Sequence, residues 1–221
     1  MVEYHKIKTV FKRNPDDKFK TLLEGEYSLP EFEYLKNNEW LLSEKIDGTN
    51  IRVMFDGEQI TFGGKTDKAY IPAPLVAKLE SIFLPQLEQF ITIFGSSDAT
   101  PISHQAFFEV CLYGEGYGAG IQKGGKYRPD QGFVLFDIRV AGWWLQRVDV
   151  EDIAAKLKID VVPSFDVSNL IGMIILAKEG FKSAWGDFVA EGIVARPVVE
   201  LRARNGSRII TKIKFKDFGG G

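Results

Sequence analysis

Lys45 stands two residues before Asp47-Gly48, in the segment Glu44-Lys45-Ile46-Asp47-Gly48-Thr49-Asn50. A lysine amine can act as a covalent nucleophile, but its ordinary pKa of about 10.4 keeps it protonated at neutral pH. Partial burial, neighbouring cations or a nearby metal ion would lower that pKa. The segment alone therefore fits two interpretations, a reactive lysine beside a tight loop or an ordinary solvated lysine at the end of a strand.

Other residues of the chain are of the types that a nucleotidyl transfer needs. Glu115 follows a predicted buried strand and could accept hydrogen bonds from ribose hydroxyls, and Phe136 offers an aromatic face on which a purine could stack. Glu191 opens another strand with a carboxylate suited to a divalent metal. Lys212 and Lys214 alternate onto one face of the final strand, where two ammonium groups could hold a phosphate and lower the pKa of the reactive lysine. Each residue alone also fits a structural role, so the hypothesis rests on their occurring together.

The elements that must position these groups mix strand-like and helix-like patterns without a regular β-α-β rhythm. This favours an α+β fold with antiparallel sheets, in one compact domain over residues 1–221. The patterns predict two strands on either side of the Asp47-Gly48 turn, a hairpin over 51–62, helical segments over 74–94 with a break at Pro85, strands over 105–113 and 132–140, helices over 149–157 and 168–178, a strand core at 193–195, and a hairpin of 199–204 with 207–215 across Asn205-Gly206.

Composition and charge narrow the class of protein. The chain has 221 residues, of which 45% are hydrophobic and 26% charged, with a net charge of −2, which is typical of a globular protein without a membrane partner. The N-terminus lacks the apolar core of a signal peptide, and the lone Cys111 has no intrachain cysteine partner. We therefore expect a cytoplasmic protein. The net charge argues against a surface covered with nucleic-acid-binding charge, but a local basic groove remains compatible with the basic residues between Arg196 and Lys216.

Five segments, in this order along the chain, resemble the signature motifs of the covalent nucleotidyltransferase superfamily of ATP-dependent ligases and capping enzymes, and most closely those of the RNA ligase 2 family. They are Lys45-Ile46-Asp47-Gly48-Thr49-Asn50, Tyr113-Gly114-Glu115 with its continuation 120–127, Phe136-Asp137-Ile138, Glu191-Gly192-Ile193-Val194, and Lys212-Ile213-Lys214. The resemblance covers about residues 40–218. It implies an ATP-grasp-like nucleotidyltransferase domain of antiparallel sheets flanked by helices.

The same resemblance implies roles for individual residues. The catalytic residues would be Lys45, Glu191, Lys212 and Lys214. The nucleotide-binding residues would be Glu44, Asn50, Lys65, Glu115, Phe136 and Arg196. Glu191 would bind the metal, with Asp137 as a second candidate, and the cofactors would be ATP and Mg²⁺ or Mn²⁺.

The implied activity is that of an ATP-dependent RNA ligase. Lys45 would form a covalent lysyl-AMP, AMP would pass to a 5′-phosphate end of nucleic acid, with RNA favoured, and a 3′-hydroxyl would then close the phosphodiester bond. The alternatives are a DNA ligase, a capping-type guanylyltransferase and a non-catalytic nucleotide-binding module. Two features depart from the family: Lys65 stands where an arginine is usual, which removes a bidentate contact to phosphate, and the chain is expected to hold the adenylyltransferase domain without a further C-terminal domain.

Overall fold

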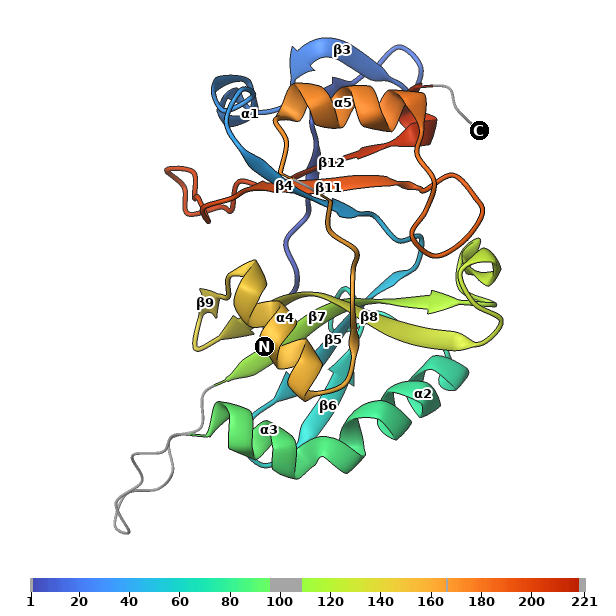
Figure 1. Cartoon of the computed structure of the whole chain (residues 1–221), viewed down its shortest axis with the longest axis vertical. Helices are drawn as coiled ribbons and strands as arrows, with labels where there is room; N and C mark the ends of the chain where they lie inside the picture. The colour runs from blue at the N-terminus through green and yellow to red at the C-terminus, as the bar shows by residue number, and fades with distance from the viewer. Residues whose placement is uncertain (1, 96–108, 166, 219–221) are drawn as a thin grey trace. The chain divides into compact units, whose positions relative to one another are not determined.

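A computed structural model describes residues 2–95, 109–165 and 167–218, and the chain divides into two units (Figure 1). Unit 1 comprises Met1–Tyr4 and Asp47–Val161, and unit 2 comprises His5–Ile46 and Val162–Gly221. The chain passes from unit 2 to unit 1 between Ile46 and Asp47, so the segment around Lys45 contributes to both. The assignment of residues 1–221 to a single nucleotidyltransferase domain stays a prediction.

Unit 1 is built on a sheet in which nearly every strand pair is antiparallel. Its strands are β5 (Thr49–Phe55), β6 (Ile60–Gly63), β7 (Val110–Gly118), β8 (Gln131–Val140), β9 (Trp143–Trp144) and β10 (Asp160–Val161). They are ordered β10-β8-β7-β5-β6, β9 pairs with β8, and only the β10–β8 pair is parallel among these described strands. Side chains alternate between the two faces of such strands, so each strand divides its residues between a core face and an opposite face.

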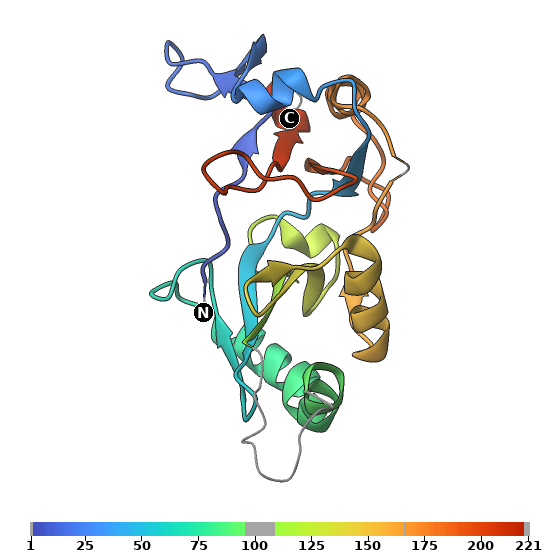
Figure 2. The ribbon, with the colours of Figure 1, turned by 90° about the vertical axis from the view of Figure 1, so that its left-hand side faces the viewer.

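Helices cover the core face of the unit 1 sheet. They are α2 (Ala73–Phe83), α3 (Leu87–Phe94), which follows the 3₁₀ turn η1 (Leu84–Gln86), and α4 (Arg147–Lys156). Their buried side chains, among them Leu79, Phe90 and Val150, form one apolar cluster with Ile51 and Leu112 of the sheet. Figure 2 shows these helices in green and gold beside the strands. A short 3₁₀ turn, η2 (Gly124–Lys126), lies between β7 and β8 in sequence.

Unit 2 contains a second sheet, ordered β1-β12-β11-β4, with β1 (Lys8–Thr9), β4 (Trp40–Glu44), β11 (Gly192–Pro197) and β12 (Thr211–Lys214). Only the β1–β12 pair is parallel within this described sheet. A separate antiparallel pair joins β2 (Phe11–Arg13) to β3 (Leu22–Tyr27), and the helical elements are α1 (Pro30–Tyr34), α5 (Leu170–Glu179) and the 3₁₀ turn η3 (Phe215–Phe218).

Helix α5 lies across one face of this sheet, as Figure 1 shows. Its buried Leu170 and Met173 join an apolar cluster with Trp40, Leu42 and Ile193. The helix begins where the Asn169 side chain accepts the Gly172 amide, and it ends at Gly180, whose φ of 78° favours glycine. Side chains that alternate with these core residues point to the opposite face of the sheet. That face carries Lys212 and Lys214 of β12.

The structure confirms the predicted α+β class and corrects some of the predicted elements. The two strands predicted on either side of Asp47-Gly48 are present as β4 and β5, and they belong to different sheets, β4 to that of unit 2 and β5 to that of unit 1. Strand β7 continues to Gly118, so Glu115 lies within a strand and not at its exit, while residues 105–108 of the predicted strand lie outside the described residues. Across Asn205-Gly206 the predicted hairpin is present but short: Arg202 bridges Arg208, the Ala203 amide donates to the Ser207 carbonyl and the Ile209 amide to the Leu201 carbonyl, whereas residues 211–214 form β12, which pairs with β11 and β1. Within the described residues, no helix is long and apolar enough to cross a membrane.

Candidate active site

Lys45, Glu191 and Lys214 form a hydrogen-bonded cluster in unit 2. The Lys45 ammonium lies 2.7 Å from Glu191 Oε2, and the Lys214 ammonium lies 2.5 Å from Glu191 Oε1. The three side chains are largely shielded, with exposed fractions of 19%, 10% and 21% for Lys45, Glu191 and Lys214. One carboxylate thus holds two predicted catalytic lysines side by side.

Strand pairing places the members of this cluster next to one another. The Lys45 amide donates to the Gly192 carbonyl at 2.9 Å, which extends the pairing of β4 with β11, and the Phe215 amide donates to the Glu191 carbonyl at 3.0 Å. A Cβ atom on Gly192 would lie 2.1 Å from the Ile213 carbonyl oxygen. Glycine is therefore required at this position, because any side chain would separate β11 from β12 beside Glu191.

The electrostatics of the cluster favour an ionised carboxylate. Burial alone would raise the pKa of Glu191, but the charge of Lys45 and the hydrogen bonds from Lys214 and Lys45 outweigh it and hold that pKa below its ordinary value. Asp217 supports the cluster from behind, since its buried carboxylate accepts the Lys214 amide at 3.0 Å and the Arg13 guanidinium at 2.9 Å. The backbone that carries Lys214 is therefore fixed.

Lys212 and Arg196 lie on the same face of the unit 2 sheet as this cluster. In the β11–β12 register, Val194 is paired with Lys212 and Gly192 with Lys214, so the two lysines are two positions apart on one face. Arg196 follows Val194 at the same spacing on β11. The two lysines that were predicted to bind phosphate and the predicted nucleotide-binding Arg196 therefore lie on the sheet face opposite α5.

The carboxylate of Glu44 is turned away from this face and is buried. It is 1% exposed, accepts a hydrogen bond from the Ser183 hydroxyl at 2.5 Å and accepts another from the Ala184 amide at 2.9 Å. The Ser183 hydroxyl in turn accepts the Trp185 amide at 3.1 Å. Glu44 thus ties the loop that leads to Glu191 onto the strand that ends beside Lys45, an arrangement that the prediction of a nucleotide contact did not anticipate.

In unit 1, Asn50 and Glu115 are direct partners in the β5–β7 register. They lie on the sheet face opposite the helices, because their neighbours Ile51 and Leu112 belong to the core. The Asn50 Oδ1 atom is buried and accepts no hydrogen bond from the described residues. A buried acceptor of this kind is unusual unless a ligand or water completes its bonding.

A β-bulge sets the direction of Phe136. Tyr113 of β7 pairs with Asp137 of β8, whereas Gly114 pairs with Leu135, so Phe136 has no residue opposite it. A bulge of this kind redirects a side chain. The half-buried ring packs against Tyr4 in a T-shaped arrangement, with ring centroids 5.1 Å apart and an interplanar angle of 74°, so this contact holds the ring in place.

Close packing within unit 1 leaves no room for a side chain at Gly48, in the segment that follows Lys45. A Cβ atom on Gly48 would lie 2.3 Å from the Gly116 carbonyl oxygen and 2.7 Å from Glu115 Cγ. The Asp47 amide donates to the Tyr127 hydroxyl at 3.2 Å. Tyr127 ends the continuation of the Tyr113-Gly114-Glu115 motif, and the sequence pattern predicts no role for it; in the structure its hydroxyl accepts the Asp47 amide and so helps to hold the loop after Lys45.

Two further predicted residues stand apart from these groups. Lys65 is exposed on the loop after β6, and this loop is held by the buried Arg52, which donates to the Gly64 carbonyl at 2.9 Å and to Asp67 at 2.7 Å. Asp137 is 2% exposed, and its Oδ2 atom accepts the Tyr4 hydroxyl at 2.7 Å. Its carboxylate therefore has a structural partner in unit 1.

No group of three or more acidic, histidine or cysteine side chains among the described residues could hold a metal ion. Both Glu191 carboxylate oxygens are engaged by lysine ammonium groups. Each of these oxygens keeps a second lone pair, so Glu191 could still offer a divalent ion one carboxylate oxygen. The remaining ligands would have to be phosphate and water oxygens, which Mg²⁺ commonly uses in nucleotide sites.

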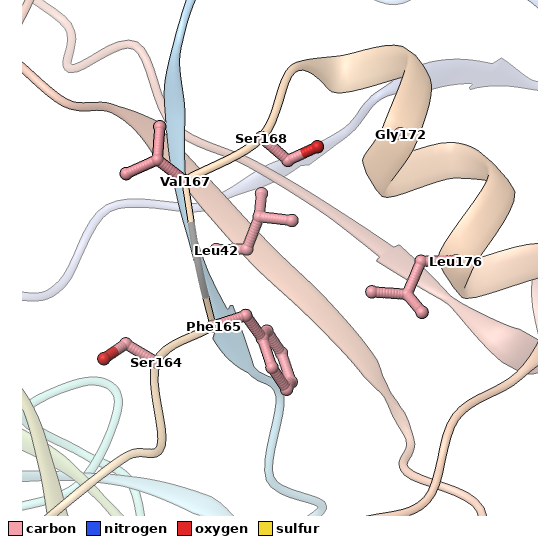
Figure 3. A pocket seen from close by; sticks show the side chains of 7 residues that line it. All are labelled: Leu42, Ser164, Phe165, Val167, Ser168, Gly172 and Leu176. Atoms are coloured by element: carbon pink, nitrogen blue, oxygen red, sulfur yellow. The ribbon is translucent and has the colours of Figure 1, made fainter.

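An open pocket of about 550 Å³ lies elsewhere in unit 2. Figure 3 shows Leu42, Phe165 and Leu176 pointing towards a common space, whereas Ser164 points away from it. None of the predicted catalytic side chains lines this pocket. It is therefore separate from the candidate active site.

Solved structures of other proteins resemble the fold of this chain. Among solved structures, a Naegleria gruberi RNA ligase variant with AMP and Mn matches with a TM-score of 0.64 and 16% identity over 96% of this chain and 57% of that chain. The same RNA ligase with PPi matches with a TM-score of 0.63 and 18% identity, with the same coverage. The chain thus spans a little over half the length of these structures, and at this identity the likeness shows the fold. No curated protein sequence matches significantly.

A family model described as RNA ligase matches residues 38–214. The matched region contains Lys45, Glu191, Lys212 and Lys214, and it covers most of both units. The chain belongs to the RNA ligase family.

Proposed function

We propose that this protein is an ATP-dependent RNA ligase that works through a lysyl-AMP intermediate on Lys45. The observation that carries the proposal is the hydrogen-bonded cluster of Lys45, Glu191 and Lys214 at the paired ends of β4, β11 and β12. A buried carboxylate between two lysines can orient a nucleophile, receive a proton and leave a second cation for phosphate. Membership of the RNA ligase family supports RNA as the substrate of this chemistry.

In the first step the Lys45 ammonium gives up a proton to solvent, and the neutral amine then attacks the α-phosphorus of ATP. A P–N bond forms, the bond from the α-phosphorus to the bridging oxygen breaks, and pyrophosphate leaves with the bonding electron pair. Glu191 Oε2, at 2.7 Å from Lys45 Nζ, is positioned to accept the proton that the amine loses. Lys214 and Lys212 stabilise the negative charge that develops on the phosphate oxygens.

The predicted roles of the unit 1 residues complete this assignment. Glu115 would accept hydrogen bonds from the ribose, and Phe136 would stack on the adenine. The buried Asn50 Oδ1 atom supports a ligand contact at that position. We assign Glu44 a positioning role instead of a nucleotide contact, because Ser183 and Ala184 already use its carboxylate. Lys65 keeps its proposed role as a contact to phosphate, and Arg196 keeps its proposed role in nucleotide binding.

The second and third steps use the adenylate and restore the enzyme. An oxygen of the RNA 5′-phosphate attacks the lysyl-AMP phosphorus, a P–O bond forms, the P–N bond breaks, and the amine regains a proton. The 3′-hydroxyl oxygen of the other RNA end then attacks the 5′-phosphate phosphorus, AMP leaves, and the hydroxyl proton passes to solvent. Mg²⁺ or Mn²⁺ bound with ATP would reduce the charge on the pyrophosphate leaving group. The expected cytoplasmic location stays a prediction.

A sealing assay with matched substrates tests this function. The protein is incubated with ATP and Mg²⁺ on nicked duplexes that have the same sequence but contain either RNA or DNA at the nick, and a parallel reaction replaces ATP by GTP. The proposal predicts sealed product with ATP, with RNA preferred. Sealing of DNA nicks alone would identify a DNA ligase, and a covalent adduct formed from GTP alone would identify a guanylyltransferase.

A further inference from the structure

Residues 200–208, here called the arginine hairpin, form a rigid projection between β11 and β12. The Ile209 amide donates to the Leu201 carbonyl, and the Ala203 amide donates to the Ser207 carbonyl. At the base of the hairpin, Arg208 makes a two-point ion pair with Glu200, at 2.5 Å for Nε to Oε1 and 3.0 Å for Nη2 to Oε2. The Arg208 side chain is 3% exposed, so this pair is internal and fixes the hairpin.

The tip of the hairpin presents Arg202 and Arg204, both exposed. Among the described residues, neither guanidinium forms a hydrogen bond or an ion pair with a carboxylate. The contrast with Arg13, Arg52 and Arg208 is clear, since each of these is paired with an acidic side chain. Two uncompensated arginines on a stiff support form a local positive site on a chain whose net charge is −2.

The hairpin lies at the end of the unit 2 sheet opposite to the catalytic cluster. Strand β11 runs from Gly192, beside Glu191, to Pro197, and the hairpin follows at the left of Figure 1. Five steps of about 3.3 Å give roughly 17 Å between the two ends of β11. Arg196 and Lys212 lie on the sheet face between the hairpin and the catalytic cluster. A row of cationic side chains therefore extends from the hairpin to Lys214.

We propose that the arginine hairpin binds the phosphodiester backbone of the RNA substrate, several nucleotides from the end that reacts. This inference rests on the proposed ligase function. Guanidinium groups bind phosphate oxygens in a two-point geometry that lysine does not reproduce. With about 3.4 Å per stacked nucleotide, the hairpin would contact the strand roughly five nucleotides from the adenylylated end.

Binding of 5′-phosphate RNAs of graded length tests the proposal. Fluorescence anisotropy on strands from about four to about sixteen nucleotides compares the wild type with the Arg202→Gln/Arg204→Gln variant. The wild type should bind more tightly once the strand exceeds about five to eight nucleotides, and the variant should lose that gain. With two phosphate contacts removed, the affinity for long strands should fall roughly 10- to 30-fold at 0.1 M salt, and the slope of log K against log salt should fall in magnitude by about 1.4.

A control variant and a second assay show whether the effect is specific to the arginine hairpin. Lys18→Gln/Lys20→Gln removes the same charge from exposed positions of unit 2 and should leave the length dependence unchanged. The hairpin variant should still form lysyl-AMP at the wild-type rate, which also shows that it is folded. An unchanged length dependence in the hairpin variant, an equal loss in the lysine variant, or impaired lysyl-AMP formation would overturn the inference. Absence of lysyl-AMP from the wild type would instead contradict the proposed function, independently of RNA binding.

Discussion

The Lys45 ammonium donates to the Glu191 carboxylate at 2.7 Å, although the two residues are 146 positions apart in the sequence. The contact follows from strand register, because the Lys45 amide already pairs with the carbonyl of Gly192, the residue after Glu191. The same carboxylate holds Lys214. The residues that we propose as nucleophile, proton acceptor and phosphate-binding cation are therefore positioned by three neighbouring strands of one sheet.

Replacing the Glu191 carboxylate should lower the free energy of unfolding by an amount that depends on pH. The pKa of Glu191 is below its ordinary value, so its ionised form stabilises the fold above the ordinary glutamate pKa of about 4.3, and this contribution is lost as the pH falls through the folded-state pKa. Glu191→Gln should lower the free energy of unfolding by about 1–3 kcal/mol at pH 7, because two ammonium groups lose their counter-charge. Urea denaturation at pH 7 and pH 4 should show a smaller difference from the wild type at pH 4. An equal difference at both pH values would contradict the account.

Removing the Ser183 hydroxyl should slow adenylylation without changing ATP binding. Ser183→Ala leaves the buried Glu44 carboxylate short of a donor, which should cost about 1–3 kcal/mol in the free energy of unfolding. Because Glu44 adjoins Lys45, the rate of lysyl-AMP formation should fall while the KM for ATP stays constant. Ser164→Ala, at an exposed position of the same unit, serves as the control. A rise in KM with an unchanged rate would instead make Glu44 a nucleotide contact.

Adding one methyl group at Gly48 should disturb unit 1. The new Cβ of Gly48→Ala would lie 2.3 Å from the Gly116 carbonyl oxygen, so strand β7 must shift, and overpacking of this kind costs about 1–3 kcal/mol. Thermal denaturation and the rate of lysyl-AMP formation should both show the loss. Gly125→Ala is the matched control, since its Cβ would meet nothing nearer than the Ala119 Cα at 3.9 Å. Wild-type stability for Gly48→Ala would show that the close approach is not required.

Truncating the ring at Phe136 should weaken the use of ATP. Base stacking on an aromatic ring contributes about 1–3 kcal/mol, so Phe136→Ala should raise the KM for ATP roughly 5- to 150-fold. Phe136→Leu keeps more apolar contact and should raise it less. Steady-state kinetics of lysyl-AMP formation measures both variants. Unimpaired activity in both would make Phe136 an ordinary packing residue.

Local patterns in the sequence were enough to predict many elements. The hairpin of β5 and β6, the helices on either side of Pro85 and the end of α5 at Gly180 are confirmed, because each depends on short-range periodicity and turn chemistry. The alternation of Lys212 and Lys214 also correctly predicted a shared sheet face. These features require no knowledge of distant residues.

Contacts between residues that are far apart in the sequence could not be predicted from such local patterns. The sequence predicted the strands on either side of Asp47-Gly48 but not their sheets, because sheet membership depends on partners such as Ile193 and Glu115, far away in sequence. The bulge that redirects Phe136 depends on the register with β7. The bond of Glu44 to Ser183 spans 139 positions, and no motif around Ser183 marks it.

The intact mass of the protein after incubation with ATP and Mg²⁺ shows whether Lys45 is the nucleophile. We expect the mass to increase by one AMP moiety in the wild type and not in Lys45→Ala, with both proteins folded by circular dichroism. Peptide mapping should locate the adduct on Lys45. A wild-type mass that never changes, or an adduct that persists in Lys45→Ala, would contradict this role of Lys45.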